Sequence, residues 1–493
     1  MHRLAPAVPA RLALPAIALA LSACADQTTA PTRALAPSSS SADLVAAASP
    51  TAGSYIVMAK GDNFDAKFSA KVEALGGKVR SVHNGAGIAV VTGLSSTAAQ
   101  SLAAVSGVAE VDADDMVSIV DPVRNLAADA LAVSTATPAI DPTKASRYAF
   151  QWNMRDINAP AAWAAGKLGA KRVTVAILDT GIDYDGVDLN GLVDLTRSIS
   201  LTTLDDTLLA KFPSRLPITD FNDHGTNVAS QVSSNAIALA GVTAKTTIMA
   251  VKVLSQSGSG FTSDVLNGIL YAADNGADVA NLSLGGSFTR KGNRQMIRVI
   301  KRVMDYAMRN GMLVVVAAGN DATDLDHNGD EFDAYCDLQH VMCVSAVGPQ
   351  TATGSPDVPS IYSNFGRAID IAAPGGNFAD PMVTSNWPWG ADEISWVWNV
   401  CSKTLIIVSQ GVSITPCASG RQLDGFVGTS QASPHVAGLA ASMVAQYGKN
   451  IPVLIRLLIE ASADDLGPRG RDAHYGWGRI NVARALGVRP LAH

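Results

Sequence analysis

Strand-like, mostly apolar runs recur through the middle of the chain, separated by segments long enough to form helices. The runs cover residues 173–178, 248–253, 278–284, 312–318, 341–347 and 368–372. An apolar run without polar alternation predicts a strand buried on both faces. Strands that alternate with helix-length segments predict a parallel sheet with helices on both sides. We therefore expect an α/β domain built on a mostly parallel central sheet.

A different pattern precedes these runs, over residues 53–117. Phe64, Phe68, Val72 and Leu75 follow helical spacing, and Ser95 is placed to cap a second helix that runs to residue 105. Strands are predicted around these helices, at residues 54–59, 78–83, 87–92 and 108–112. The resulting β-α-β-β-α-β order is typical of a ferredoxin-like α+β unit. We expect a separate small domain here.

The amino terminus reads as an export signal followed by a tether. Residues 1–24 carry Arg3 and Arg11 and then an apolar stretch at 12–21, too short for a stable membrane span. Residues 25–52 are rich in Ala, Ser, Thr and Pro, which predicts a disordered tether. A second segment of low aromatic content, 118–147, predicts a linker.

Three short motifs carry the residue types of nucleophilic catalysis. Asp179 follows the apolar run at 173–178, so it is expected at the carboxyl end of a strand, where open α/β sheets bind ligands. His224 opens a predicted helix. Ser430 follows Gly428 and precedes a helix of small residues, so it is expected at a helix amino terminus, where free N–H groups favour negative charge. We place Pro434 in the first turn of that helix, where proline is tolerated.

In the order Asp, His, Ser, these motifs resemble those of the subtilisin-like serine proteases, or subtilases, over about residues 148–486. The resemblance implies the three-layer subtilisin-like fold for a catalytic domain at 148–487, and serine endopeptidase activity on polypeptides. It makes Ser430 the nucleophile, His224 the general base and Asp179 the group that orients the imidazole. The family places its oxyanion asparagine at the end of the run 312–318, which identifies Asn320.

The resemblance also implies a substrate cleft. Gly258, Ser259 and Gly260 resemble the edge that pairs with an extended substrate. A second segment resembles the wall of the pocket for the residue before the scissile bond (P1): Ser283, Leu284, Gly285 and Gly286. A substrate that binds by strand addition is held mainly through its peptide backbone, which predicts broad specificity toward substrate side chains. Each glycine run can alternatively be a plain turn. Gln431 stands where many relatives carry methionine, and we expect it to confer peroxide tolerance.

The small domain at 53–117 resembles the inhibitory (I9-type) propeptide of subtilases, both in element order and in its position before the catalytic domain. The resemblance implies a zymogen whose own propeptide assists folding, blocks the cleft as an intramolecular inhibitor and is removed by self-cleavage within 118–147. An unrelated adhesion or spacer module is the alternative.

The positions of the cysteines indicate that the protein is exported from the cytoplasm. Leu21-Ser22-Ala23-Cys24 resembles a bacterial lipobox, so Cys24 is a candidate for lipidation that would anchor the precursor at the cell envelope, with ordinary signal cleavage and secretion as the alternative. Four cysteines remain, and sequence proximity favours the disulfides Cys336–Cys343 and Cys401–Cys417, with free buried thiols as the alternative.

Each of two segments after the oxyanion motif has two possible interpretations. Asp324, Asp326, Asn328 and Asp330 alternate as in the first half of a calcium loop, although Tyr335 stands where a chelating glutamate is expected. A structural Ca²⁺ is one reading and a solvated acidic loop the other; catalysis itself needs no cofactor. The insertion at 377–424 carries four of the seven tryptophans and either grips substrate or packs on the enzyme.

Composition limits the remaining possibilities. A net charge of −6 and the absence of a basic stripe argue against a nucleic-acid partner. Membrane association is expected only through a lipid anchor, and the chain is expected to be a monomer. A catalytically silent binding protein and a peptide ligase or transferase on the same scaffold are the other function classes. An α/β-hydrolase is excluded because it requires a Gly-x-Ser-x-Gly elbow and the order Ser, Asp, His.

Overall fold

The computed structural model describes residues 53–119, 123–127, 141–349, 355–377, 395–409, 412–414, 417, 423–449 and 452–490. The predicted signal segment with Cys24, the predicted tether, and Trp387 and Trp389 of the insertion lie outside the described residues. None of the helices in these ranges combines the length and the apolarity that crossing a bilayer requires.

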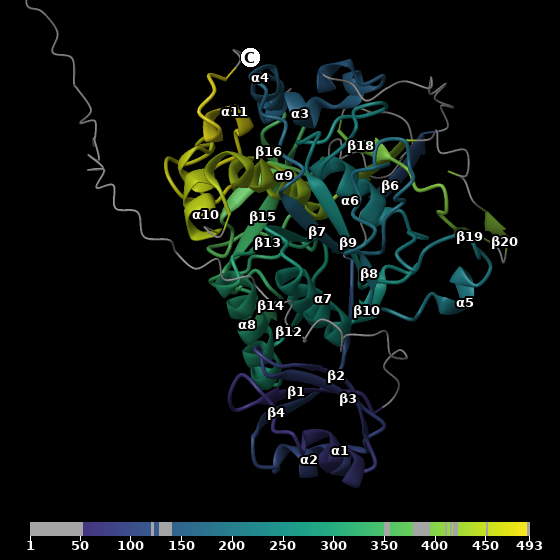
Figure 1. Cartoon of the computed structure of the whole chain (residues 1–493). Helices are drawn as coiled ribbons and strands as arrows, with labels where there is room; N and C mark the ends of the chain where they lie inside the picture. The colour runs from purple at the N-terminus through teal and green to yellow at the C-terminus, as the bar shows by residue number, and fades with distance from the viewer. Residues whose placement is uncertain are drawn as a thin grey trace, which may run out of the picture. The chain divides into compact units, whose positions relative to one another are not determined.

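A large, mostly parallel sheet forms the centre of the catalytic region (Figure 1). Its strands lie in the order β16-β15-β13-β11-β7-β9-β8, and β17 pairs with β15 outside this path. Only the β15–β16 pair is antiparallel among these pairings. The strands are β7 (Thr174–Asp179), β8 (Ile199–Ser200), β9 (Thr247–Lys252), β11 (Val279–Leu282), β13 (Leu313–Ala317), β15 (Val341–Gly348), β16 (Val358–Pro359) and β17 (Ile371–Pro374).

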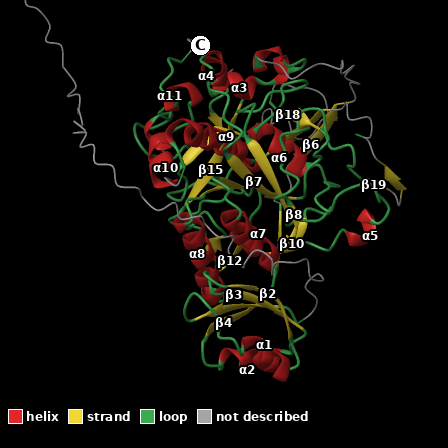
Figure 2. Ribbon diagram, in the orientation of Figure 1, coloured by secondary structure: helices red, strands yellow, loops and turns green. Residues whose placement is uncertain are grey.

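Both faces of this sheet are buried, as the mostly apolar runs predict. Along β7, Val175 and Ile177 belong to one hydrophobic cluster and Ala176 and Leu178 to another, because successive side chains point to opposite faces. The first cluster includes residues of α6 (His224–Val232), α9 (Thr429–Tyr447) and α10 (Pro452–Ala461). The second includes residues of α7 (Thr262–Asp274) and α8 (Arg294–Arg309). These five helices, red in Figure 2, thus form the outer layers of a three-layer α/β fold.

The predicted strands form close to their expected positions, with one shift. The last run was predicted at 368–372, whereas β17 begins at Ile371. The residues before it form a turn, closed by the bond from Ile369 N to Gly366 O. Pairing with β15 starts only where Ile371 lies beside Val344.

The amino-terminal region has the predicted β-α-β-β-α-β order. Its elements are β1 (Tyr55–Ala59), α1 (Phe68–Ala74), β2 (Lys78–His83), β3 (Ile88–Thr92), α2 (Ser96–Ala103) and β4 (Val108–Ala113). The antiparallel sheet has the order β2-β3-β1-β4 and its own hydrophobic core, which includes Val57, Phe68 and Leu102. Ser95 caps α2 as predicted, since its hydroxyl accepts a hydrogen bond from Ala98 N.

Shorter elements complete the fold. The strands are β5 (Met116–Ser118), β6 (Val123–Ala127), β10 (Ser259–Phe261), β12 (Ser287–Thr289), β14 (Glu331–Asp333), β18 (Val397–Val400), β19 (Ile407–Ser409), β20 (Val412–Ile414) and β21 (Leu423–Val427). The helices are α3 (Trp152–Asp156), α4 (Ala159–Ala164), α5 (Asp206–Leu209) and α11 (Val482–Ala485), with 3-10 turns at Pro142–Lys144 and Tyr148–Phe150. Strand β6 lies inside the predicted linker and pairs with β21, a partner that no local pattern reveals.

The cysteines and two tryptophans of the insertion settle two alternatives. The disulfides Cys336–Cys343 and Cys401–Cys417 both form, as predicted. Trp396 and Trp398 are buried, at 7% and 2% exposure. Trp152 donates its indole N–H to the carbonyl oxygen of Trp396 at 2.9 Å. This part of the insertion therefore packs on the body of the enzyme.

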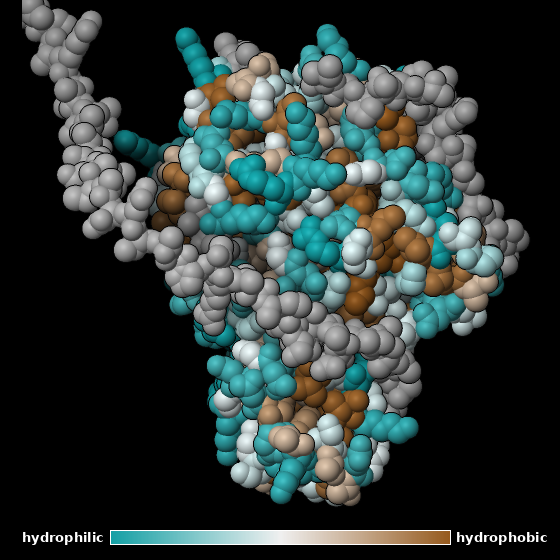
Figure 3. All heavy atoms as spheres, in the orientation of Figure 1, coloured by the Kyte–Doolittle hydropathy of each residue, from teal (hydrophilic) through white to brown (hydrophobic). Residues whose placement is uncertain are grey.

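Three exposed apolar side chains lie on one helix. Val453, Leu454 and Leu457 of α10 are each about half exposed, and Trp477 is also exposed. Figure 3 shows hydrophobic surface at the edge where Figure 1 places α10.

Candidate active site

Asp179 and His224 form a buried hydrogen-bonded pair. Asp179 is the last residue of β7, and His224 is the first residue of α6. The distance from Asp179 Oδ1 to His224 Nδ1 is 2.8 Å, and both side chains are almost fully buried. The carboxylate can only accept, so Nδ1 carries the proton and Nε2 carries the lone pair. His224 Nε2 has no hydrogen-bond partner in the described part of the protein, so it is free to accept a proton.

The pair is held together by a close approach of two backbone segments. Gly225 follows the histidine, and a Cβ at this position would lie 2.2 Å from the carbonyl oxygen of Gly181. Only glycine therefore lets α6 begin so close to the end of β7. The carboxylate of Asp220 accepts hydrogen bonds from the hydroxyl groups of Thr180 and Thr226, which joins the two segments a second time.

Ser430 is the second residue of α9, as its motif predicts. Its hydroxyl donates a hydrogen bond of 3.2 Å to the carbonyl oxygen of Ser283. No hydrogen bond joins this hydroxyl to His224 among the described residues. Catalytic hydrogen bonds are often long or misaligned before substrate binds, so this arrangement is compatible with a nucleophile at rest.

Asn320 is fixed with a free amide donor. It follows β13 and the turn residue Gly319, whose φ is 100°. The Oδ1 atom of Asn320 accepts hydrogen bonds of 2.8 Å from both the N–H and the hydroxyl of Thr429. Its Nδ2 atom is buried and has no partner in the described protein. Thr429 immediately precedes Ser430, so the same contacts tie this donor to the start of α9.

The position of Pro434 differs from the prediction. Helix α9 begins at Thr429, so Pro434 is the sixth helical residue and lies inside the helix rather than in its first turn. A proline leaves the carbonyl four residues earlier, here that of Ser430, without its helical donor. The Ser283 hydroxyl donates to this carbonyl at 2.8 Å. Ser283, predicted in the pocket wall, is fully buried and directed at α9.

The predicted substrate edge is occupied by the chain itself. Strand β5 pairs antiparallel with β10, with Ser118 beside Ser259 and Val117 beside Gly260. Ile119 N donates to Gly258 O at 2.9 Å. On the opposite side, Gly285 N donates to Ser118 O at 3.3 Å. Residues 116–119 therefore lie between the two segments that were predicted to bind an extended peptide.

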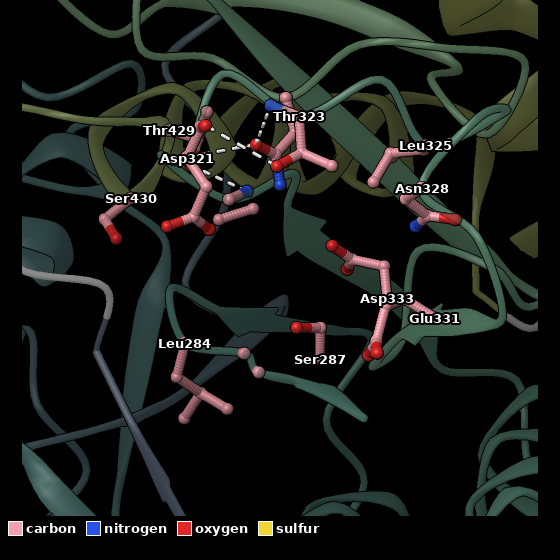
Figure 4. Close-up of a pocket in the computed structure, with 15 residues that line it drawn as sticks. Leu284, Ser287, Asp321, Thr323, Leu325, Asn328, Glu331, Asp333, Thr429 and Ser430 are labelled. Atoms are coloured by element: carbon pink, nitrogen blue, oxygen red, sulfur yellow. Dashed lines mark hydrogen bonds between the residues drawn. The ribbon is translucent and has the colours of Figure 1, made fainter. Parts of the chain in front are cut away.

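A cavity of about 280 Å³ opens beside Ser430 (Figure 4). Leu284, Gly285 and Gly286 line it, so the structure brings the predicted pocket wall to the nucleophile. The opposite side of the cavity carries Glu331 and Asp333 of β14, two residues that were not predicted from the sequence. The alternation Glu-Phe-Asp was the available signal, because it places both acids on one face of a strand.

The structure gives no support to the predicted calcium loop. Asp324 bonds to the imidazole of His327 at 2.7 Å, Asp326 accepts from the Arg367 guanidinium at 3.1 Å, and Asp330 accepts from Lys291 N at 2.9 Å. The three carboxylates do not gather into a candidate metal group among the described residues. The group that does converge consists of Asp223, Cys401 and Asp424, but the sulfur of Cys401 is bound in a disulfide. Calcium binding therefore stays a prediction.

Residues 170–478 match the family model described as the subtilase family. Thermitase from Thermoactinomyces vulgaris is 32% identical over 350 residues, covering 70% of this chain and 98% of thermitase. A thermophilic serine proteinase from Bacillus sp. strain AK1 is 30% identical over 340 residues, covering 68% of this chain and 67% of that protein.

Two solved structures share the fold. The epidermin leader peptide processing serine protease of Staphylococcus aureus superimposes with a TM-score of 0.67 at 22% identity, covering 88% of this chain and 98% of that chain. Fervidolysin from Fervidobacterium pennivorans gives a TM-score of 0.64 at 21% identity, covering 90% of this chain and 62% of that chain. At these identities the likeness concerns the fold alone.

Proposed function

Because this chain belongs to the subtilase family and is a serine-type endopeptidase, we propose that it cleaves polypeptides through Asp179, His224 and Ser430 and is made as a self-processing zymogen. The supporting observation for the chemistry is the buried Asp179–His224 pair, which leaves Nε2 unpartnered. The supporting observation for the zymogen is strand β5, which lies in the cleft.

In the first chemical step, Ser430 Oγ attacks the scissile carbonyl carbon and its proton moves to His224 Nε2. Asp179 stabilises the imidazolium that forms. The carbonyl oxygen becomes an oxyanion and accepts hydrogen bonds from Asn320 Nδ2 and the backbone N–H of Ser430. His224 then donates its proton to the leaving amine, and the acyl-enzyme forms. Water, deprotonated by His224, releases the acyl group and restores the serine.

The amino-terminal domain contacts the catalytic domain through α7. Arg80 forms a buried ion pair of 2.5 Å with Asp264, and Asn267 Nδ2 donates to Ser81 Oγ at 3.1 Å. Asp114 accepts from both the N–H and the hydroxyl of Ser263 at the start of this helix. These contacts support the role of inhibitory propeptide, because they hold β5 against β10. The first self-cleavage then falls on the carboxyl side of Ile119, within the predicted segment that ends at 147.

The lipid anchor belongs to the same proposal. A cut after Ile119 separates the catalytic domain from Cys24, so an enzyme tethered while inhibited is released when it becomes active. Two disulfides fit an oxidising compartment outside the cytoplasm.

Labelling with a fluorophosphonate probe tests the nucleophile. The mature enzyme is expected to form one covalent adduct, mapped by peptide mass spectrometry to Ser430, and to lose casein hydrolysis in proportion to labelling. The His224→Ala variant is expected to label far more slowly, because the serine then lacks its base. Folded enzyme that hydrolyses casein while Ser430 stays unlabelled contradicts the proposal.

A further inference from the structure

Three carboxylates line the cavity beside Ser430. Glu331 and Asp333 lie two residues apart on β14, so both side chains project from the same face of the strand. The side chain between them, Phe332, is buried in the hydrophobic cluster against α8. Asp321 lines the cavity from the loop after β13. Figure 4 shows Ser430 on one side of the cavity and Glu331 and Asp333 across from it.

These carboxylates have no cationic partner in the described part of the chain. The nearby guanidinium of Arg290 pairs instead with Asp337 at 2.6 Å and lies over the ring of Phe332. No lysine, arginine or histidine is among the residues that line the cavity. The amide of Asn364 lies close to Asp333 but carries no charge.

Asp333 is the most deeply placed of the three, with only 9% of its surface exposed. Burial raises its pKa to about 8, and the negative charges of Asp337 and Asp321 act in the same direction. Ionising a buried carboxyl group without a countercharge is costly. A cation that enters the cavity would supply that countercharge.

The apolar residues that line the cavity indicate what kind of cation fits it. Leu284 and Leu325, with the glycines at 285 and 286, provide apolar surface in the cavity, and Leu284 lies on the side of Ser430 (Figure 4). A long side chain with an apolar stem and a charged end matches such a cavity, because the stem contacts the walls while the head reaches the carboxylates. Lysine and arginine are the residues with this chemistry.

We infer that this cavity is the P1 pocket and that Asp333, with Glu331 and Asp321, selects substrates with lysine or arginine before the scissile bond. The inference rests on the proposed function and narrows the broad specificity expected from backbone pairing alone. Self-cleavage does not test it, because β5 already positions the bond within the same chain, and such positioning compensates for a poor P1 residue.

The experiment compares peptide amides that differ only in the P1 residue, with Arg, Lys, Phe, Leu or Glu, hydrolysed by the mature enzyme. We expect kcat/KM for Arg and Lys to exceed that for Phe and Leu by about tenfold or more. In Asp333→Asn and Glu331→Gln, the values for Arg and Lys should fall by about tenfold while those for Phe and Leu stay within about threefold. The matched control is Asp330→Asn, which removes a neighbouring carboxylate that does not line the cavity.

Inhibition by benzamidine tests the cavity without a set of peptides that differ in the P1 residue. This flat cation should inhibit hydrolysis of the Phe peptide competitively, and Asp333→Asn should weaken the inhibition by about tenfold. Equal or better cleavage after Phe and Leu, with no response to Asp333→Asn or Glu331→Gln, overturns the inference but leaves the proposed function intact. Failure to cleave any of the peptides, together with casein, counts against the proposed function itself.

Discussion

The hydroxyl of Ser283 donates a hydrogen bond of 2.8 Å to the carbonyl oxygen of Ser430, the acceptor that Pro434 leaves without a helical donor. Ser283 thus connects the end of β11 to the first turn of α9. It supports the nucleophile from behind, and its own carbonyl oxygen receives the nucleophile's hydroxyl. Its side chain positions the serine and has no direct contact with substrate in this account.

Ser283→Ala should therefore lower kcat by about tenfold with a smaller change in KM, because the start of α9 loses a fixed contact. The buried Ser430 carbonyl and the amide of Asn281 also lose their partner, which costs about 1–3 kcal/mol of stability. Steady-state kinetics and thermal unfolding measure the two effects. Ser433→Ala is the control, because Ser433 contacts Ser283 but not the Ser430 carbonyl. Equal losses in both variants contradict the positioning role.

Asn320→Ala should lower kcat by about 10²–10³ with little change in KM, a magnitude measured for the corresponding donor in subtilisin. The reason is that the unpartnered Nδ2 is available to the oxyanion, which forms only during the reaction. A parallel fluorophosphonate titration counts intact active sites. If kcat falls by less than tenfold while all active sites titrate, donors other than Asn320 stabilise the oxyanion, which contradicts the prediction.

Arg80→Ala should weaken inhibition by the propeptide. The ion pair with Asp264 is buried, and removal of one partner of such a pair costs about 3–5 kcal/mol, which corresponds to a rise in the inhibition constant of at least 10². The assay adds residues 53–119 to mature enzyme and follows peptide hydrolysis. Lys71→Ala is the control, because its ion pair with Asp65 is exposed and lies within the small domain. Equal inhibition by the variant and the parent rejects the assigned interface.

The preference for a basic P1 residue should increase with pH. The pKa of Asp333 is raised to about 8, so in the empty pocket this group is mostly protonated at pH 6 and increasingly charged toward pH 8. A cationic side chain binds the charged form better. The ratio of kcat/KM for Arg over Phe should therefore rise several-fold from pH 6 to pH 8, whereas Asp333→Asn should flatten it. The ratio removes pH effects that are common to both substrates, and Glu331, Asp321, Asp337 and Arg290 are unchanged in the variant.

Gln431→Met should make the enzyme sensitive to peroxide. Gln431 is fully buried next to the nucleophile, and methionine at this position would form a polar sulfoxide in a packed site. Residual activity after timed exposure to dilute peroxide is the measurement, with peptide mass spectrometry to locate the oxidised residue. Rapid inactivation of the parent enzyme through this segment contradicts the predicted tolerance.

Local pattern was sufficient where a residue's environment is set by its neighbours in sequence. The run that ends at Asp179 and the cap at Ser95 each determine local backbone geometry, and the structure has them as predicted. That Asp179, His224 and Ser430 belong to one site was predicted from the order of their motifs and from the family resemblance.

Local pattern failed where a distant partner decides. Strand β6 forms because β21 lies beside it, and the acids of β14 reach the P1 pocket because Asp333 pairs with Ser287 of β12. In the acidic loop, Asp326 accepts from Arg367 and Asp330 from the backbone N–H of Lys291, contacts that spacing within the loop cannot reveal. The position of Pro434 within the helix depends on where α9 starts, and Asn320 contacts that start from outside the helix by accepting from Thr429 N.

The most direct test of the account is the intact mass of the purified chain without residues 1–24, followed over time beside its Ser430→Ala variant. The parent is expected to lose its propeptide, gain a new amino terminus between residues 120 and 148 and cleave casein, while the variant stays full length and inactive. A Ser430→Ala variant that matures at the same rate in the absence of other proteases would contradict the claim that Ser430 is the nucleophile of self-cleavage.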